Sequence, residues 1–158
     1  MSSNYSINFN TPKRSKKLIK FIIIHYTGMK SQAKAIERLC DSSSKVSAHY
    51  FIKDNGKLLN LVPDLYEAWH AGKSSWKNLK ALNKYSIGIE INNSGHDYGY
   101  PKFKKRQIST LKKLLKNLIN KYKIRNRNIL GHSDIAPDRK KDPGEKFPWK
   151  NLANKDLS

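Results

Sequence analysis

Runs of apolar residues along the chain predict a β-sheet with helices packed on it. The run LIKFIIIHYTG, residues 18–28, is nearly continuous and rich in β-branched residues, which is typical of a strand buried on both faces. Residues 104–122 instead place apolar residues at helical spacing with Lys on the other side, which predicts an amphipathic helix. Its expected buried stripe consists of Ile108, Leu111, Leu115, Leu118 and Tyr122. A shorter helix is expected over residues 31–40, with an inner side formed by Ala33, Ile36 and Cys40.

Three other segments have the patterns of strands. Residues 85–92, YSIGIEIN, alternate between isoleucine and other residues, so the two sets of side chains point to opposite faces. The two sets are Ile87, Ile89 and Ile91 on one face, and Ser86, Gly88 and Glu90 on the other. Residues 47–62 have the pattern of a β-hairpin that turns at Asn55-Gly56. A last short strand is expected at residues 128–130.

Together these elements predict a mixed α/β (α+β) fold, with a central mixed sheet of about five strands and flanking helices. The length of 158 residues fits one domain that can bury a core without disulfides or a structural metal. Residues 1–18 are polar and end in the basic run PKRSKK, so we expect a flexible N-terminal segment there. The folded domain is then expected over residues 19–158.

Charge is the most unusual feature of the composition. The chain carries 32 Lys and Arg against 12 Asp and Glu, a formal net charge of +20. Such a surface attracts polyanions, but a general preference for Lys as the polar residue would produce the same excess, so charge alone identifies no partner. The single cysteine, Cys40, excludes an intramolecular disulfide. No apolar run approaches the roughly 20 residues that a membrane span needs.

Three candidate metal ligands follow predicted strands. His25 closes the first apolar run, His132 follows the strand at residues 128–130, and Asp142 comes ten residues later. Two neutral imidazoles and one carboxylate are a known zinc ligand set that leaves a fourth position open. Glycine or proline at three nearby positions restricts the backbone or lets it approach closely. These positions are Gly131, Pro137 and Pro143.

Two further residues could act beside such a metal. Glu90 lies on the non-isoleucine face of its strand beside Gly88, and a carboxylate there could take a proton from water. Lys140 lies two residues before Asp142, so in an extended segment its ammonium could stabilise an oxyanion beside the metal. The plainer alternatives are a structural role for each single histidine and an ordinary surface position for Lys140. The structural interpretation is favoured for His49, His70 and His96, although the first two could line the same cleft.

Five motifs in a fixed order resemble those of the zinc-dependent N-acetylmuramoyl-L-alanine amidases. They are FIIIHYTG, VSAHYFIKDNGKLLNLVP, AWHAGKSSW, NKYSIGIEINN and GHSDIAPDRKKDPGEKFPW, and they cover roughly residues 19–152. The superfamily is that of the type-2 amidases, which includes phage T7 lysozyme and the peptidoglycan recognition proteins. The Gram-negative muropeptide amidases are the most similar branch. The resemblance implies cleavage of the amide bond between N-acetylmuramic acid, or its 1,6-anhydro form, and L-alanine.

The resemblance also implies roles for individual residues. One zinc ion is expected on His25, His132 and Asp142. The catalytic residues are expected to be Glu90 and Lys140. Substrate contacts are expected at Lys45, His49, Trp69, His70, Ala71 and Gly72. An arginine that some relatives carry is replaced near Ala81, which bears on the preference for the anhydro sugar.

Two other functions fit parts of the sequence. A non-catalytic peptidoglycan-binding module of the same fold would need neither an open metal position nor a base, so the intact set of five residues favours an enzyme. A nucleic-acid-binding protein is suggested by charge alone, without a helix-turn-helix, RNP or zinc-finger pattern. We therefore expect a monomeric enzyme that acts on peptidoglycan or muropeptides and binds no nucleic acid.

The N-terminal sequence MSSNYSINFN lacks the basic region and the apolar stretch of a signal peptide. Together with the single cysteine, this favours the bacterial cytoplasm. The periplasm or cell envelope is the alternative if the chain is a truncated or processed form.

Overall fold

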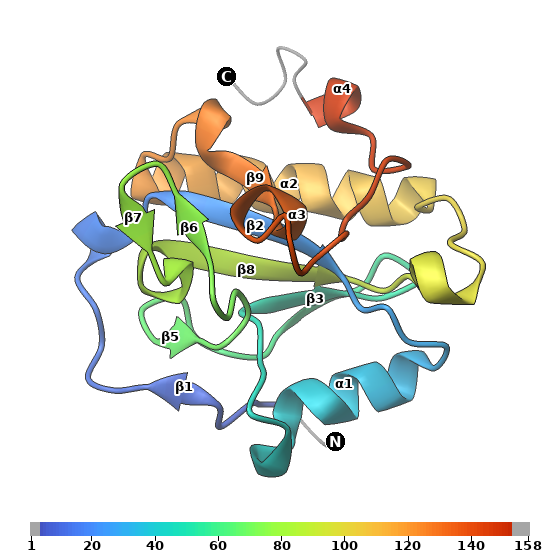
Figure 1. Ribbon diagram of the computed structural model, residues 1–158, viewed down its shortest axis with the longest axis horizontal. Helices are drawn as coiled ribbons and strands as arrows, with labels where there is room; N and C mark the ends of the chain where they lie inside the picture. Colours follow the sequence, from blue (N-terminus) through green and yellow to red (C-terminus); the bar gives the residue numbers. More distant parts are fainter. Residues whose placement is uncertain (1–3, 153–158) are drawn as a thin grey trace.

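The computed structural model describes residues 4–152, and a five-stranded mixed sheet forms its centre (Figure 1). The strands lie in the order β4-β3-β8-β2-β9. Their bounds are Phe21–Tyr26 for β2, Tyr50–Ile52 for β3, Leu58–Asn60 for β4, Ser86–Ile91 for β8 and Ile129–Gly131 for β9. The strands β3, β8, β2 and β9 are parallel, and β4 runs antiparallel to β3. The predicted sheet is therefore confirmed.

Strand β2 is buried because it pairs on both sides, with β8 and with β9. This agrees with the continuous apolar run that predicted it. The hairpin of β3 and β4 is also confirmed, with Tyr50 opposite Asn60. Its turn needs glycine at position 56, where φ is +85° and the N–H donates to the carbonyl of Lys53 at 2.9 Å.

Helix α2, Lys105–Tyr122, covers one face of the sheet (Figure 1). It packs on the isoleucines that point to this face, namely Ile22, Ile24, Ile87, Ile89 and Ile91. The whole predicted stripe of this helix is buried, together with Gln107 and Leu114. Burial of a Leu or Ile side chain stabilises a fold by about 1.5–3 kcal/mol, so this face is the main core of the domain.

The opposite face of the sheet is covered by shorter elements. Helix α1, Gln32–Cys40, is capped by Ser31, whose hydroxyl accepts from the backbone N–H of Lys34 at 3.2 Å. The predicted inner side of this helix is partly wrong. Ala33 is exposed, and the buried residues are Ala35 and Leu39. They lie four positions apart and so share a side, whereas Ala33 lies two positions from Ala35 and points away.

The remaining elements are short. Two small antiparallel sheets pair β1 with β5 and β6 with β7. Their strands are Phe9–Asn10, Glu67–Ala68, Ser75–Trp76 and Leu79–Lys80. The short helices are α3, His132–Ile135, and α4, Trp149–Leu152. Single 3-10 turns span Lys16–Leu18, Ser42–Ser44, Leu82–Tyr85, His96–Tyr98 and Asn126–Asn128. Within residues 4–152, no helix combines the length and the apolar character that crossing a membrane requires.

Residues 4–18, the described part of the predicted lead-in, make specific polar contacts with the domain. The side-chain amide of Asn8 is buried and donates to the carbonyl of Val46 at 2.8 Å. The guanidinium of Arg14 donates to the carbonyls of Asn83 and Asp64, each at 2.8 Å. Side-chain to backbone contacts of this kind leave no apolar pattern in the sequence.

We expect Leu111→Ala to lower the free energy of unfolding by about 2–5 kcal/mol, because Leu111 is fully buried between α2 and the sheet and its truncation leaves a cavity. Urea unfolding of the metal-free protein measures this. Lys113→Ala, on the exposed side of the same helix, is the matched control and should change stability by no more than about 0.5 kcal/mol. Equal effects of the two substitutions would contradict the packing described for α2.

Candidate metal centre

Three parallel strands end at one edge of the sheet and carry the first residues of the site. His25 on β2 is the register partner of Glu90 on β8. On the other side of β2, Ile24 pairs with Gly131, the last residue of β9, so His132 follows beside His25. Because side chains alternate along a strand, His25 and Glu90 both project away from α2. Ligands of α/β folds are commonly bound at such carboxyl ends of strands.

A loop returns Asp142 to the same edge. A Cβ at position 131 would lie 2.7 Å from the ring of Pro143, so glycine is what lets the loop approach β9. The carbonyl of Asp142 accepts from the backbone N–H of Ser133 at 2.9 Å. The carboxylate of Asp134 accepts from the N–H of Gly131 at 2.8 Å. The close approach predicted for Gly131 is confirmed.

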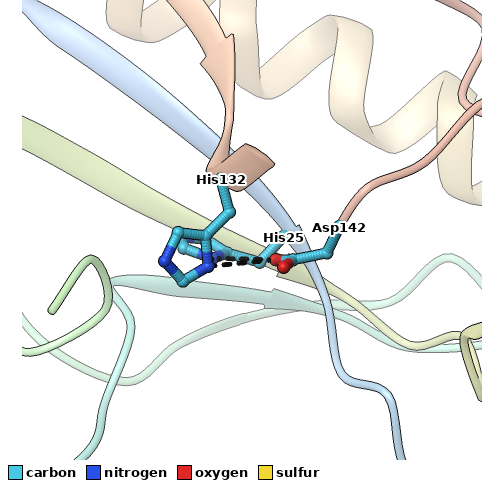
Figure 2. A group of neighbouring side chains, drawn as sticks. All are labelled: His25, His132 and Asp142. Atoms are coloured by element: carbon cyan, nitrogen blue, oxygen red, sulfur yellow. Dashed lines mark hydrogen bonds and ion pairs between the residues drawn. The ribbon is translucent and has the colours of Figure 1, made fainter. Parts of the chain in front are cut away.

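Three side-chain atoms converge at this point (Figure 2). The Nδ1 atoms of His25 and His132 are 3.0 Å apart, and Oδ2 of Asp142 lies 3.2 Å from each of them. The exposed fractions of the three residues are only 1%, 5% and 6%. Ligand atoms bound tetrahedrally to one zinc ion lie about 3.3–3.5 Å apart, given zinc–ligand distances of roughly 2.0–2.2 Å. The observed spacing is close to this value.

The ring orientation of His132 is set by a backbone carbonyl. Its Nε2 lies 2.9 Å from the carbonyl oxygen of Ala71. A carbonyl can only accept, so Nε2 carries the proton of the neutral ring. The Nδ1 atom of neutral His132 therefore presents a lone pair to the other two side chains.

The orientation of His25 is set by a chain of three hydrogen bonds. The hydroxyl of Ser86 donates to the carbonyl of Leu82 at 2.6 Å, so its oxygen is left to accept from Nε2 of His70 at 3.1 Å. The Nδ1 atom of His70 is then unprotonated and accepts from Nε2 of His25 at 3.0 Å. It follows that Nδ1 of His25 also presents a lone pair.

Burial lowers the pKa of three imidazoles, those of His25, His49 and His70, and so keeps them neutral. Burial, and next the proximity of His132, lowers the pKa of His25 to about 4. Burial, followed by the charge of Arg14, lowers the pKa of His49 to about 3. Burial, followed by His25, holds the pKa of His70 well below its usual value. At neutral pH each of these three rings carries one proton, as the hydrogen bonds require.

With both histidines in these tautomers, two imidazole lone pairs and one carboxylate face one another. Such a set is repulsive by itself and is the donor set that binds a divalent cation. The residues present therefore fit a metal ion, and His25, His132 and Asp142 would hold it.

Glu90 is the acidic group next to this centre. Within residues 4–152 its buried Oε2 atom has no hydrogen-bond partner. Burial, and next the charge of Asp142, raises the pKa of Glu90 well above its usual value, whereas the ammonium of Lys140 acts in the opposite direction. A carboxyl group with these properties is suited to accept and release a proton.

The metal centre opens into a cavity of about 490 Å³. The side chains of Glu90 and Lys140 line it together with the three candidate ligands. Lys140 is exposed and projects from the loop that carries Asp142. The cavity wall also carries Arg38, Lys141 and Asp97, so a ligand there would meet both signs of charge.

The predicted substrate residues divide into two groups. Trp69 and His70 line the cavity. Lys45, His49, Ala71 and Gly72 are not among the described residues that line it. His49 is fully buried below the site, where its Nδ1 accepts from the N–H of Gly88 at 3.0 Å. Ala71 acts through its carbonyl, which holds His132.

Sequence reasoning missed the polar support of the site. The side-chain oxygen of Asn83 accepts from the backbone N–H groups of His70 and Ala71, at 3.1 and 2.7 Å. The guanidinium of Arg139 donates to the carbonyl of Ala71 at 3.1 Å. No spacing rule relates residues 83 and 139 to residue 71. One part of this support could have been expected from the sequence. Ser86, which contacts His70, lies on the same strand face as Glu90.

Comparison with known families identifies relatives of the whole region. A family model described as N-acetylmuramoyl-L-alanine amidase matches residues 14–145. The N-acetylmuramoyl-L-alanine amidase AmiD of Escherichia coli K12 is 39% identical over 151 residues, which is 88% of this chain and 54% of AmiD. The 1,6-anhydro-N-acetylmuramyl-L-alanine amidase AmpD of the same organism is 40% identical over 106 residues, 66% of this chain and 55% of AmpD. The chain spans about half the length of these curated relatives.

Solved structures show the same fold. AmpDh3 from Pseudomonas aeruginosa, in complex with anhydromuramic pentapeptide, is 35% identical with a TM-score of 0.81, covering 97% of this chain and 66% of its own. AmiD from E. coli, in complex with the substrate anhydro-N-acetylmuramic acid-L-Ala-D-gamma-Glu-L-Lys, is 37% identical with a TM-score of 0.79, covering 91% and 60%. The predicted fold and the predicted family resemblance are both confirmed.

We expect the metal-free protein to lose stability as the pH falls from 6.5 towards 4. The unfolded chain gains protons on its histidines in this range, whereas His25, with a pKa of about 4, and His49, with a pKa of about 3, stay neutral until lower pH. Each such histidine contributes a slope of up to about 1.4 kcal/mol per pH unit. Glu90, whose pKa is raised, opposes the trend above pH 4.5, because its proton is retained only in the folded state.

Replacing His49 tests the contribution of one buried histidine to this pH dependence of stability without changing a candidate ligand. In His49→Asn the new Oδ1 can still accept from the N–H of Gly88, while the titrating group is gone. Urea unfolding in the presence of a chelator should show a shallower fall of stability between pH 6.5 and 4 than in the parent protein, by the slope of one histidine, about 1.4 kcal/mol per pH unit at most. Identical slopes would show that His49 takes up a proton in the folded state.

Proposed function

Because the chain belongs to the N-acetylmuramoyl-L-alanine amidase family, we propose that it is a zinc-dependent enzyme that hydrolyses the amide bond between N-acetylmuramic acid and L-alanine. The observation that carries this proposal is the convergence of His25, His132 and Asp142 in an open cavity, beside a carboxyl group whose Oε2 atom has no hydrogen-bond partner within residues 4–152. Binding alone would require no such arrangement. Amide hydrolysis requires a polarised carbonyl, a base for water and an acid for the leaving amine.

The zinc ion, when bound, supplies Lewis acidity that polarises the scissile carbonyl and makes water more acidic. Glu90 takes the proton of the attacking water on its Oε2 atom, which has no hydrogen-bond partner within residues 4–152. The same carboxyl group then delivers that proton to the departing amine of L-alanine. Its raised pKa suits both halves of this transfer.

Lys140 is proposed to stabilise the negative charge that forms on the carbonyl oxygen. Two observations support this role: it lines the cavity together with Glu90, and its positive charge counteracts the rise in the pKa of Glu90. Because the side chain is exposed, it can move to the oxygen as the substrate binds. Contacts of this kind contribute a factor of roughly 10²–10³ to turnover.

The proposed substrate is a muramyl peptide, either soluble or within peptidoglycan. Trp69 lines the cavity and is fixed by two contacts, from its backbone N–H to the hydroxyl of Ser47 and from its indole N–H to the side chain of Asn10. A fixed aromatic wall of this kind suits a sugar ring or a peptide backbone. The relative AmiD has been crystallised with an anhydro-muramyl tripeptide. The other predicted contacts, at Lys45, His49, His70, Ala71 and Gly72, stay predictions.

A non-catalytic peptidoglycan-binding module of the same fold is the second candidate, because the net charge of +20 would favour acidic wall polymers in either case. Incubation of the zinc-loaded protein with intact sacculi and with anhydro-muropeptides separates the two functions. Release of stem peptides, detected by mass spectrometry, supports the enzyme and shows which substrate size is used. Retention on sacculi without release supports the binding module. The cytoplasmic location, its envelope alternative and the monomeric state stay predictions.

We expect Glu90→Gln to lower turnover by about 10²–10⁴-fold, because the amide has the shape of the carboxyl group but cannot accept the proton of water. Release of L-alanine-terminated peptide from an anhydro-muramyl peptide is the measurement, and bound zinc is determined on the same samples. The zinc content should equal that of the parent protein, since Glu90 is outside the ligand set. Turnover near the parent rate, with zinc bound, would remove Glu90 from the mechanism.

A further inference from the structure

One short segment, residues 70 and 71, contacts both histidines of the metal centre. The ring of His70 contacts His25, and the carbonyl of the next residue, Ala71, contacts His132. We propose that His70 is a positioning residue of the metal centre, which, backed by Ser86, holds His25 as the tautomer whose Nδ1 is free for the metal. The proposal rests on the metal site but is independent of amide hydrolysis.

The position of His70 is fixed from behind. Ser86 is fully buried, and its only proton is donated to the carbonyl of Leu82, so it can only accept from the ring. Gly88 leaves the space that the ring needs, since a Cβ there would overlap the ring atoms of His70. The exposed fraction of His70 is 7%, and both of its nitrogens have protein partners. The ring therefore has no polar edge left to offer a substrate.

The tautomer matters because the alternative competes with the metal. If His25 carried its proton on Nδ1, that proton would point at Nδ1 of His132 and Oδ2 of Asp142, which lie 3.0 and 3.2 Å away. The three residues could then form hydrogen bonds among themselves and close the site. Because Nδ1 of His70 accepts the proton on Nε2 of His25, His70 favours the open donor set. Partners of this kind commonly change metal affinity by about 10–100-fold.

Two substitutions separate the hydrogen bond from the packing. His70→Phe keeps a ring of similar size but cannot accept from His25, and we expect the zinc dissociation constant to rise by about 10–100-fold. His70→Asn places a side-chain oxygen near the position of Nδ1 and should restore most of the affinity. The affinity is measured by competition with a chromogenic chelator. The visible spectrum of the cobalt-substituted protein should change in His70→Phe and return towards the parent spectrum in His70→Asn.

Thr110→Val is the matched control, because it removes a partly buried hydrogen bond, from Thr110 to the carbonyl of Gly56 at 2.6 Å, on the helix that covers the other face of the sheet. Its zinc affinity should equal that of the parent protein. Parent affinity in a folded His70→Phe protein would overturn the proposal. Equal losses in the Phe and Asn variants would also overturn it, because packing would then be the cause.

If His70→Phe does not fold, the decisive measurement is which nitrogens of His25 and His70 carry protons in the metal-free parent protein. Two-bond proton–nitrogen NMR of ¹⁵N-histidine-labelled protein reports them directly. Protons on Nε2 of both His25 and His70 support the proposal, and a proton on Nδ1 of either ring overturns it. A parent protein that binds zinc with these tautomers but releases no stem peptide would refute the proposed function and leave this inference standing.

Discussion

The parallel pairing of β2 with β8 and β9 is the constraint on which the site depends. The pairing with β8 sets His25 beside Glu90, and the pairing with β9 brings His132 next to His25. Because side chains alternate along a strand, a slip of one residue would turn His25 into the core under α2 and expose an isoleucine in the cavity. The isoleucines that pack on α2 therefore stabilise more than the fold. They also fix the register that assembles the metal centre.

Much of this arrangement could be predicted from the sequence. The continuous run of β2, the alternation of β8 and the stripe of α2 are strong periodic signals, and all three are confirmed. The candidate ligands were found because they lie at strand ends or beside proline. The weaker periodicity of α1 gave a wrong position for Ala33, since nine residues with few apolar positions define a buried side poorly. Amphipathic patterns identify burial, not polar partners.

What the sequence could not provide is the set of contacts between side chains and backbone. The segment Trp69–Gly72 was interpreted as a wall for substrate, yet its histidine ring and the carbonyl of Ala71 mainly face the two histidines of the metal centre. Arg14 and Asn8 bind carbonyl groups far away in the chain. Contacts of this type depend on where two segments meet in space and leave no periodic trace.

The double acceptor role of Asn83 has a mechanical consequence. One oxygen atom holds the N–H groups of both His70 and Ala71, so the supports of the two metal-binding histidines are fastened at a single point. A disturbance at that point would therefore affect the hydrogen bonds to both imidazoles together rather than to one alone. The loop of Asp142 is tied to the same region, because Arg139 donates to the carbonyl of Ala71 and the carbonyl of Asp142 accepts from the N–H of Ser133 beside His132. All three candidate ligands therefore depend on one polar support, which no pattern of apolar residues encodes.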